Sequence, residues 1–403
     1  MADTGPRQST RFLLLYALAA AGGAVAYVPF LTVLLPVRVT ALAGEADVTW
    51  LAYLTLGGAT MASLANVAFG WLSDRSHSRL PWVLAGLVLS SIFLVMIPQA
   101  QDFTSLIVFI MAWQVGLNMM LAPLAAWAGD CVPDHQKGLL GGLLAFAPAL
   151  GAASGALVTI PGLADADSRL VMVALLVTAM VLPVVFFGRP APMPQLMKDD
   201  PPQPGARVDP PERLKSRSVV SRMWFARLLV QIAEAALFAY LLFWFRSIDS
   251  SVRDSDIARI FAVVLVVAVP LAIVIGRWSD RHVRPILPLA ISAGLAAVGL
   301  LAMAIAPSLV YATAGYVLFG LAATIFLSLH TGQTLRVLPR PSHRGRDLGL
   351  FNLTNTVPSL IMPWLTLALV PVFGFSGLFW LLAGLAVVAS LLLASIPRPG
   401  TAQ

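Results

Sequence analysis

The sequence predicts an all-α membrane protein with twelve transmembrane helices in two pseudo-symmetric halves of six helices. Hydrophobic residues make up 59% of the 403 residues and charged residues only 11%, too little polar surface to cover a water-soluble globule. Apolar runs of roughly 20 residues, long enough to cross about 30 Å of hydrocarbon, recur along the whole chain. The pattern Gly-x-x-Ser-Asp-Arg occurs at Gly70–Arg75 and again at Gly276–Arg281, which indicates a duplicated unit.

Each half supplies six apolar runs, in order along the chain. Gly22-Gly23, Pro148, Pro270 and Pro363 fall inside runs, which membrane helices tolerate because neighbouring helices satisfy the freed backbone groups. The first run is long enough to be retained as a span rather than removed as a signal. The predicted spans cover residues 12–36, 49–72, 80–98, 103–128, 138–160, 169–187, 221–245, 256–275, 285–306, 309–333, 348–372 and 377–396.

The distribution of basic residues predicts the orientation. With a cytoplasmic N-terminus, 20 of the 26 Lys and Arg residues lie in or beside loops on the cytoplasmic side. The positive-inside rule then places both termini in the cytoplasm. The net charge of +7 follows from this topology and from attraction to anionic lipid, so no nucleic-acid partner is needed to explain it. We expect a multi-pass protein of the cell membrane, or of the inner membrane in a Gram-negative source, with the lipid bilayer as its partner.

A proline-rich segment separates the two halves. Residues 188–220 contain eight prolines and ten charged residues, a composition that cannot bury enough apolar area to fold. We therefore predict an N-terminal half at 1–187, a cytoplasmic linker at 188–220 and a C-terminal half at 221–403. Cys131 is the single cysteine and cannot form an internal disulfide. We expect the protein to be a monomer.

Six plus six spans, a central hydrophilic loop and a Gly-x-x-x-Asp-Arg turn after the second span of each half resemble the major facilitator superfamily. The resemblance implies that the Asp of the first turn caps the start of span 11. It also implies that a basic residue of that turn pairs with an acid at the end of span 4, which here is Asp130, and holds the cytoplasmic side shut. The candidate cytoplasmic gate residues are Gly70, Asp74, Arg75, Arg79, Asp130, Gly276, Asp280 and Arg281.

The residue types of the two turns suit this role on physical grounds. Glycine lets one helix end lie against a neighbouring helix, and a carboxylate can accept hydrogen bonds from an exposed helix N-terminus. The superfamily signature usually continues with a further Gly, which both copies lack: they read His77-Ser78-Arg79 and His282-Val283-Arg284. The alternative is that these charges only set topology and end helices.

Two further stretches, Asp130–Gly138 and Arg346–Pro358, are similar to sucrose-type carriers and to the glycoside-pentoside-hexuronide cation symporters. This resemblance implies a transporter of a small polar solute, a sugar or glycoside, that works by alternating access. Sodium-coupled members of that branch carry acids in spans 2 and 4, and this chain has none there. The proton is therefore the expected coupling ion, and no other cofactor is expected.

Glu234 is the sole acid deep within a predicted span. A charge at mid-bilayer costs about 2.5–3.5 kcal/mol on insertion scales, so an acid there needs a partner, a proton or a water-filled cavity. Arg227, Gln231 and Glu234 share one helical face at i, i+4 and i+7. We predict that Glu234 couples to protons or contacts the solute; the alternative is a static network that holds span 7 to a neighbour.

Other polar side chains form helical stripes inside predicted spans. Amides and phenols suit hydroxyl-rich or otherwise polar, uncharged solutes, although each could equally make a hydrogen bond between helices. The predicted solute or proton site comprises Glu234, Arg227, Gln231, Gln114, Asn118, Tyr16, Tyr27, Asn352 and Asn355.

The sequence also bears on two other function classes. Gly142, Gly151 and Gly155 follow a G-x8-G-x3-G spacing that resembles the signature of drug and metabolite antiporters, so proton-coupled efflux of an amphipathic compound is the main alternative. An enzyme is disfavoured, because the five histidines have no metal-ligand spacing and the chain has no Gly-Lys-Ser nucleotide loop. No metal site is expected.

Overall fold

The computed structural model of the chain describes residues 6–43, 47–160, 162–197, 214–252, 254–338 and 340–396. Every regular element within these ranges is a helix, so the predicted all-α class is confirmed. Part of the predicted linker, residues 198–213, lies outside the described residues.

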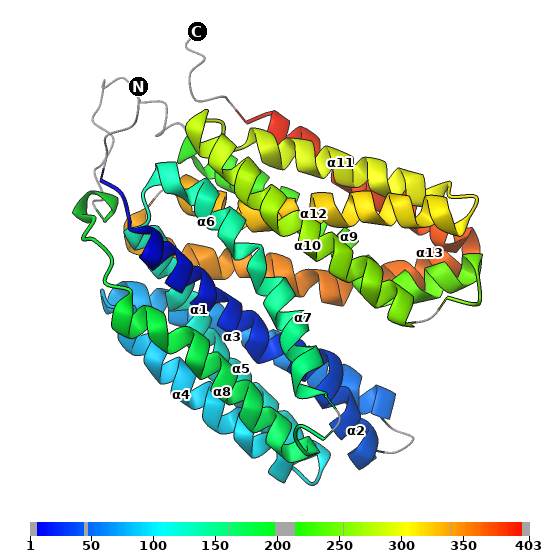
Figure 1. The fold of residues 1–403 in the computed structure, drawn as a ribbon, viewed down its shortest axis with the longest axis horizontal. Helices are drawn as coiled ribbons and strands as arrows, with labels where there is room; N and C mark the ends of the chain where they lie inside the picture. The colour runs from blue at the N-terminus through cyan, green and yellow to red at the C-terminus, as the bar shows by residue number, and fades with distance from the viewer. Residues whose placement is uncertain are drawn as a thin grey trace. The chain divides into compact units, whose positions relative to one another are not determined.

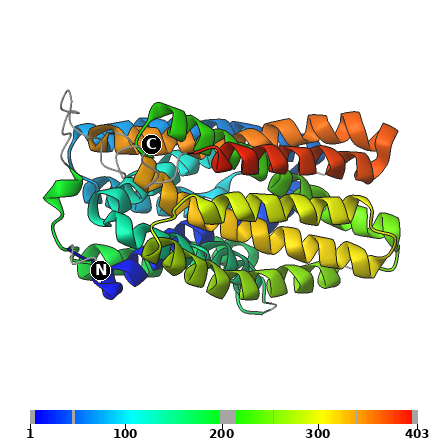
Figure 2. The same cartoon turned by 90° about the horizontal axis from the view of Figure 1, so that it is seen from above.

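The helices cluster into two compact units. Unit 1 comprises Met1–Pro133, Phe146–Asp199 and Arg340–Asn352; unit 2 comprises Asp134–Ala145, Asp200–Pro339 and Leu353–Gln403. Each unit therefore takes one short segment from the opposite half of the sequence. Within each unit the long helices run side by side along a common direction (Figures 1 and 2).

Unit 1 is built around α1, which packs against α7 and α8, and around the pair α4 and α5. A Cβ on Gly86 would overlap the backbone of α5 at Met120, so glycine is what allows α4 and α5 to touch along their backbones. Its helices are α1 (Thr10–Pro29), the π-helical turn η1 (Phe30–Leu34), α2 (Leu35–Ala43), α3 (Asp47–Arg75), α4 (Leu80–Met96), α5 (Phe103–Cys131), α7 (Phe146–Val158), α8 (Ala166–Phe187) and the first turns of α13 (Arg344–Ala394).

Unit 2 is built around α12, which packs against α6, α9, α10 and α11. The fully buried rings of Phe245, Phe326 and Phe379 fill its interior. Its helices are α6 (Lys137–Leu144), α9 (Arg217–Ile248), α10 (Asp254–Arg281), α11 (Leu287–Ala304), α12 (Leu309–Val337) and the remainder of α13.

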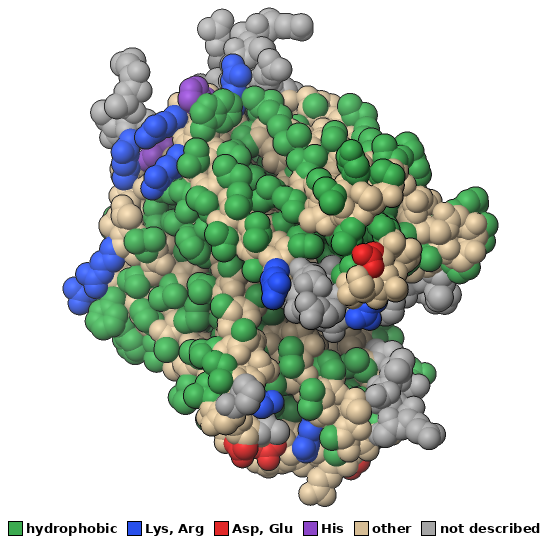
Figure 3. Space-filling model, turned by 45° about the vertical axis from the view of Figure 1, so that its right-hand side comes forward, with side chains coloured by type: hydrophobic (Ala, Val, Ile, Leu, Met, Phe, Trp, Pro, Cys, Tyr) green, Lys and Arg blue, Asp and Glu red, His purple; other side chains and the backbone are tan. Residues whose placement is uncertain are grey.

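Nine helical stretches of the described residues are long and apolar enough to cross a membrane. Three further long helical stretches, α3, α9 and the first part of α13, occupy the positions of predicted spans 2, 7 and 11. Hydrophobic side chains cover much of the face drawn in Figure 3, as expected of a surface that contacts lipid tails. Twelve spans and the cytoplasmic position of both termini stay predictions.

Two breaks in the helices have local causes. Predicted span 5 is divided at Ala145 into α6 and α7, because the ring of Pro148 clashes with the carbonyl of the residue four positions earlier, Leu144. Predicted spans 11 and 12 correspond to two helices, together labelled α13, that meet at Gly374, whose non-helical φ of 64° and ψ of −175° are available to glycine alone.

Candidate functional site

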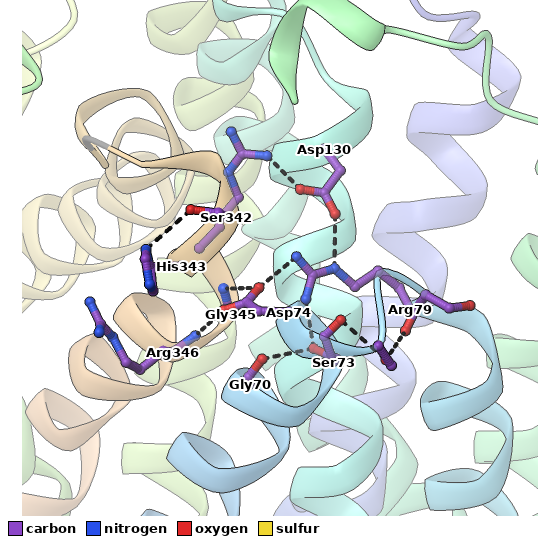
Figure 4. A network of polar contacts seen from close by, with 12 residues as sticks. Gly70, Ser73, Asp74, Arg79, Asp130, Ser342, His343, Gly345 and Arg346 are labelled. Carbon is purple, nitrogen blue, oxygen red and sulfur yellow. Dashed lines mark hydrogen bonds and ion pairs between the residues drawn. The ribbon is translucent and has the colours of Figure 1, made fainter. Parts of the chain in front are cut away.

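The first repeated turn lies at the C-terminal end of α3, and its aspartate accepts hydrogen bonds from the N-terminus of another helix. Asp74 is buried, and its two carboxylate oxygens accept hydrogen bonds from the backbone N–H groups of Gly345 at 2.9 Å and Arg346 at 3.0 Å (Figure 4). Both residues lie in the first turn of α13, whose N–H groups have no partners within the helix. The positive end of the helix dipole favours an anion there. Asp74 therefore holds the start of α13.

Arg79 connects Asp74 to a second acid. Its guanidinium lies 2.7 Å from Asp74 and 2.8 Å from Asp130, and it donates a hydrogen bond to the Ser73 hydroxyl (Figure 4). Arg344 contacts the other oxygen of Asp130 at 2.5 Å. Burial lowers the pKa of Arg79, but the two carboxylates more than offset it, so its pKa is raised. Asp74, Arg79, Asp130 and Arg344 form a buried chain of alternating charge, the unit 1 turn network.

The second repeated turn lies at the C-terminal end of α10, and its aspartate likewise binds a helix N-terminus within unit 2. The Asp280 carboxylate accepts hydrogen bonds from the N–H groups of Gly138 at 3.0 Å and Leu139 at 2.8 Å, in the first turn of α6. Arg336, near the end of α12, contacts Asp280 at 3.0 Å. Beside it, Lys137 pairs with Asp134 at 2.6 Å. Asp280, Arg336, Lys137 and Asp134 form the unit 2 turn network.

The two networks differ at one equivalent position. Asp74 and Asp280 are 206 residues apart, and the same offset relates Asp130 to Arg336. An acid in unit 1 is thus replaced by a base in unit 2, and the cation that steadies Asp280 comes from α12 rather than from the turn.

The remaining arginines of the two turns are exposed. Arg75 lies over the ring of Trp71, with 5.7 Å between the guanidinium carbon and the ring centre. Arg281 and Arg284 are also exposed, and within the described ranges none of these three forms an ion pair. Contacts to acids are therefore made by Arg79, Arg336 and Arg344 instead.

Glycine allows a close helix contact at each turn, and one later residue in each turn has a positive φ. A Cβ on Gly70 would overlap the Gly345 carbonyl, and one on Gly276 would overlap the Gly138 carbonyl, so each turn touches the incoming helix through glycine. Seven residues after each of these glycines, His77 and Val283 have positive φ values of 50° and 53°.

A second candidate site lies in unit 2, on facing helices. On α9, the Arg227 guanidinium contacts Thr331 at 3.1 Å and His330 at 3.4 Å on α12, and Asn355 at 3.3 Å on α13. Gln231 donates a hydrogen bond to the same Asn355 oxygen at 2.6 Å. Arg227, Gln231, His330, Thr331 and Asn355 form what we call the polar cluster, which brings together three residues predicted from the sequence.

The protonation of His330 follows from its partners. The ring is fully buried, and its Nε2 lies 3.0 Å from the carbonyl of Met223, which can only accept, so Nε2 carries the proton. Nδ1 then faces the Thr334 hydroxyl at 3.1 Å and the Arg227 guanidinium. A neutral ring presents a lone pair there, whereas a charged ring would place a second cation against Arg227.

Glu234 lies on α9 two turns beyond Arg227 and is partly buried. Within the described ranges its carboxylate has no hydrogen-bond or ion-pair partner, and Arg227 lies beyond ion-pair distance. The acid is thus not locked into a static pair with Arg227. Nor do the described residues contain a group of three His, Cys, Asp or Glu side chains that could hold a metal ion.

The other predicted site residues make contacts within unit 1. Asn118 accepts a hydrogen bond from Asn66 at 2.9 Å and donates one to the Gln114 carbonyl, joining α3 to α5. The Tyr16 hydroxyl donates to the Leu124 carbonyl, whereas Tyr27 is 41% exposed. Asn352 belongs to unit 1. Their part in solute binding stays a prediction.

Several residues of these sites were not predicted. Arg344, His330 and Thr331 gain their roles from contacts more than a hundred residues away, which no local pattern signals. Arg336 could have been found, because the repeat offset of 206 maps Asp130 onto it.

Comparisons with known proteins agree with this architecture. A family model described as Major Facilitator Superfamily matches residues 12–253 and 223–403. A search of curated proteins finds no significant match.

Among solved structures, the human organic anion transporter MFSD10 (TETRAN) is similar with a TM-score of 0.75 at 13% identity, covering 95% of this chain and 99% of that chain. The transporter FucP, in the outward conformation, has a TM-score of 0.75 at 14% identity, covering 96% and 99%. The proton:xylose symporter XylE has a TM-score of 0.74 at 12% identity, covering 96% of each chain. At such identities these likenesses show the fold alone.

Proposed function

The chain belongs to the major facilitator superfamily, and we propose that it is a secondary active transporter that moves a small polar solute, a sugar or glycoside, by alternating access with proton coupling. The observation that carries this proposal is the polar cluster. Five polar side chains from α9, α12 and α13 meet among apolar helices, where unused polar groups are costly. Amide and hydroxyl groups of this kind suit a hydroxyl-rich solute.

The two turn networks supply the gate in this proposal. Asp74 holds the start of α13, which comes from the C-terminal half of the sequence, and Asp280 holds the start of α6, which comes from the N-terminal half. If the two sequence halves rock against each other, both sets of contacts have to break and re-form. Solute and proton would drive this change by binding one access state better than the other.

Glu234 is the proposed proton carrier. It is an acid within a predicted span and, among the described residues, no contact fixes it in the charged form. Its surroundings and its access to water change if the two sequence halves move relative to each other, so its affinity for a proton can differ between access states. The alternative role, static support of α9, predicts that removing its charge leaves coupling intact.

Uptake into proteoliposomes tests the proposal. Labelled D-xylose and D-glucose are offered with and without an inward proton gradient, to the wild type, to Glu234→Gln and to Asp165→Asn, an exposed helix cap, as the control. We expect the gradient to drive accumulation in the wild type and the control. Glu234→Gln should retain downhill exchange and lose accumulation; accumulation that survives the substitution removes Glu234 from coupling.

Efflux of an amphipathic compound is the alternative. Its sequence basis, the spacing of Gly142, Gly151 and Gly155, is divided by the helix break at Ala145. Gly142 packs on the backbone of Ile273, so close packing alone accounts for a small residue there. Proton-dependent extrusion of a drug from loaded vesicles, without transport of either sugar, would favour this alternative over the proposal.

A further inference from the structure

We propose that the polar cluster binds a carboxylate on the solute, so that the transported compound is a hydroxylated monocarboxylate of the sugar-acid type. This inference rests on the proposed function and narrows its substrate class. It starts from Arg227, a permanently charged side chain whose described contacts are all neutral: Thr331, His330 and Asn355. Within the described ranges no carboxylate lies at ion-pair distance from Arg227.

An arginine without an ion-pair partner is unusual within a predicted span, and the acid whose charge acts on Arg227, Glu234, lies two turns further along α9, beyond ion-pair distance. Arg227 is the seventh residue of predicted span 7 (221–245), about 9 Å along the helix from the first residue of that span at 1.5 Å per residue. Charged side chains within membrane spans are rare, pair with one another or line a solute pathway. The turn networks illustrate the paired arrangement, since each of their arginines contacts a carboxylate. Arg227 differs from them and has the arrangement expected of a solute-binding residue.

The neutral contacts also orient the guanidinium. Thr331 and His330 contact one terminal nitrogen and Asn355 the other, while no described residue partners Nε. Of five N–H donors, the three contacts leave two, Nε–H and one on a terminal nitrogen. Two such donors match the two oxygens of a carboxylate, which arginine binds with parallel hydrogen bonds. A single guanidinium, with the acid Glu234 two turns along the same helix, favours a monoanion over a doubly charged phosphate.

The remaining members of the polar cluster can form hydrogen bonds with the hydroxyl groups of the solute. Gln231 donates one hydrogen bond to Asn355, and its amide has a further N–H and a carbonyl oxygen. Asn355 is exposed and Arg227 and Thr331 are partly exposed, so a solute can reach the polar groups without unfolding the unit. Vicinal hydroxyls beside a carboxylate would find both a cation and amides, which is the combination that a sugar acid requires.

Matched pairs of solutes test the inference. D-glucuronate, D-galacturonate and D-gluconate carry a carboxylate where D-glucose, D-galactose and D-glucitol carry a hydroxymethyl group. Binding is measured by thermal shift of the purified full chain, and transport by counterflow in proteoliposomes. We expect the wild type to prefer the acids. Arg227→Gln should weaken acid binding roughly tenfold or more, the loss expected for hydrogen bonds to a charged group, and should leave the neutral sugars unaffected.

Two further variants serve as controls. Arg222→Gln, on the same helix but bound to Ser395, should keep the preference for acids. Arg227→Lys retains the charge without the two-pronged donor and should fall between the wild type and Arg227→Gln, which keeps the test open if the glutamine variant misfolds. A wild type that does not prefer acids, or a preference that survives Arg227→Gln, overturns the inference. Transport of neutral sugars without acid preference overturns it while leaving the proposed function; transport of neither class overturns both.

Discussion

The two turn networks start from the same Gly-x-x-Ser-Asp-Arg pattern, and each holds the start of a helix, but with different partners. In each, an aspartate accepts hydrogen bonds from two backbone N–H groups at a helix start, Asp74 on α13 and Asp280 on α6. The residue that follows this aspartate in the network differs: Arg79 in unit 1 bridges to Asp130, whereas Arg336 in unit 2 occupies the position equivalent to Asp130. A carboxylate at the helix start and an arginine beside it are common to both units, while the residues at the equivalent positions, Asp130 and Arg336, have opposite charge.

The comparison predicts that equivalent substitutions in the two turn networks lower the free energy of unfolding by different amounts. Asp130 contacts two buried arginines, so Asp130→Asn leaves Arg79 and Arg344 short of negative charge. We expect a loss of about 3–5 kcal/mol, the range for breaking a buried ion pair by removing one partner. Denaturant unfolding in detergent measures it. Asp102→Asn, at an exposed cap where Asn serves as well as Asp, is the control and should change little.

The equivalent substitution in unit 2 should cost less. Arg336→Gln leaves Asp280 with both backbone N–H donors of α6, so we expect a loss of about 1–3 kcal/mol in the same unfolding assay. A loss equal to that of Asp130→Asn would show that the supporting cation matters as much as the helix start, and the comparison would fail.

Asp74→Asn weakens the hold on α13 while keeping a hydrogen-bonding side chain. We expect about 1 kcal/mol less stabilisation of the docked α13, which raises the population of the undocked, inward-opening state about fivefold. Cys131, the single cysteine, is partly buried next to Asp130 and reports on this change. Its labelling by a maleimide should be several-fold faster in Asp74→Asn and unchanged in Arg75→Gln. Equal rates in the two variants would remove Asp74 from the gate.

The smallest effects concern the positive-φ positions of the two turns. A left-handed conformation costs an L-residue roughly 1–2 kcal/mol, more for a β-branched side chain, and His tolerates it better than Val. Val283→Gly should therefore stabilise the protein by up to about 1 kcal/mol and His77→Gly by less, because glycine loses part of the gain as chain entropy. Ser76→Gly, which lacks a positive φ, should be destabilising instead.

Features that arise from local or periodic patterns could be predicted from the sequence, whereas features that depend on long-range contacts could not. The helical class and the repeated turns are local or periodic, and the resemblance pointed to Asp130 as the partner of a turn residue, where the structure has Arg79. Arg344 was not predicted because it reaches Asp130 across 214 positions. The break at Ala145 also needed the structure, since Pro148 sits inside an apolar run and only the carbonyl clash divides it.

Only part of the candidate solute site was predicted, because the sequence shows spacing within one helix but not contacts between helices. Helical spacing on one segment placed Arg227, Gln231 and Glu234 on a common face, and α9 carries all three. Spacing within a helix says nothing about which other helix faces it. The contacts of Arg227 to His330 and Asn355 span 103 and 128 positions and therefore required the structure.

The exchange of short segments between the units has a consequence for the order of synthesis. When the ribosome completes Asp280, its partners Gly138 and Leu139 have already been made. Asp74 precedes Gly345 by 271 residues, a delay of about 14–54 s at 5–20 residues per second. During that interval Asp74 lacks the N–H groups that bind it in the complete structure, and the start of α13 is the last segment of unit 1 to be made. A truncated or stalled chain that ends before residue 344 should therefore leave unit 1, rather than only the C-terminal half, incomplete.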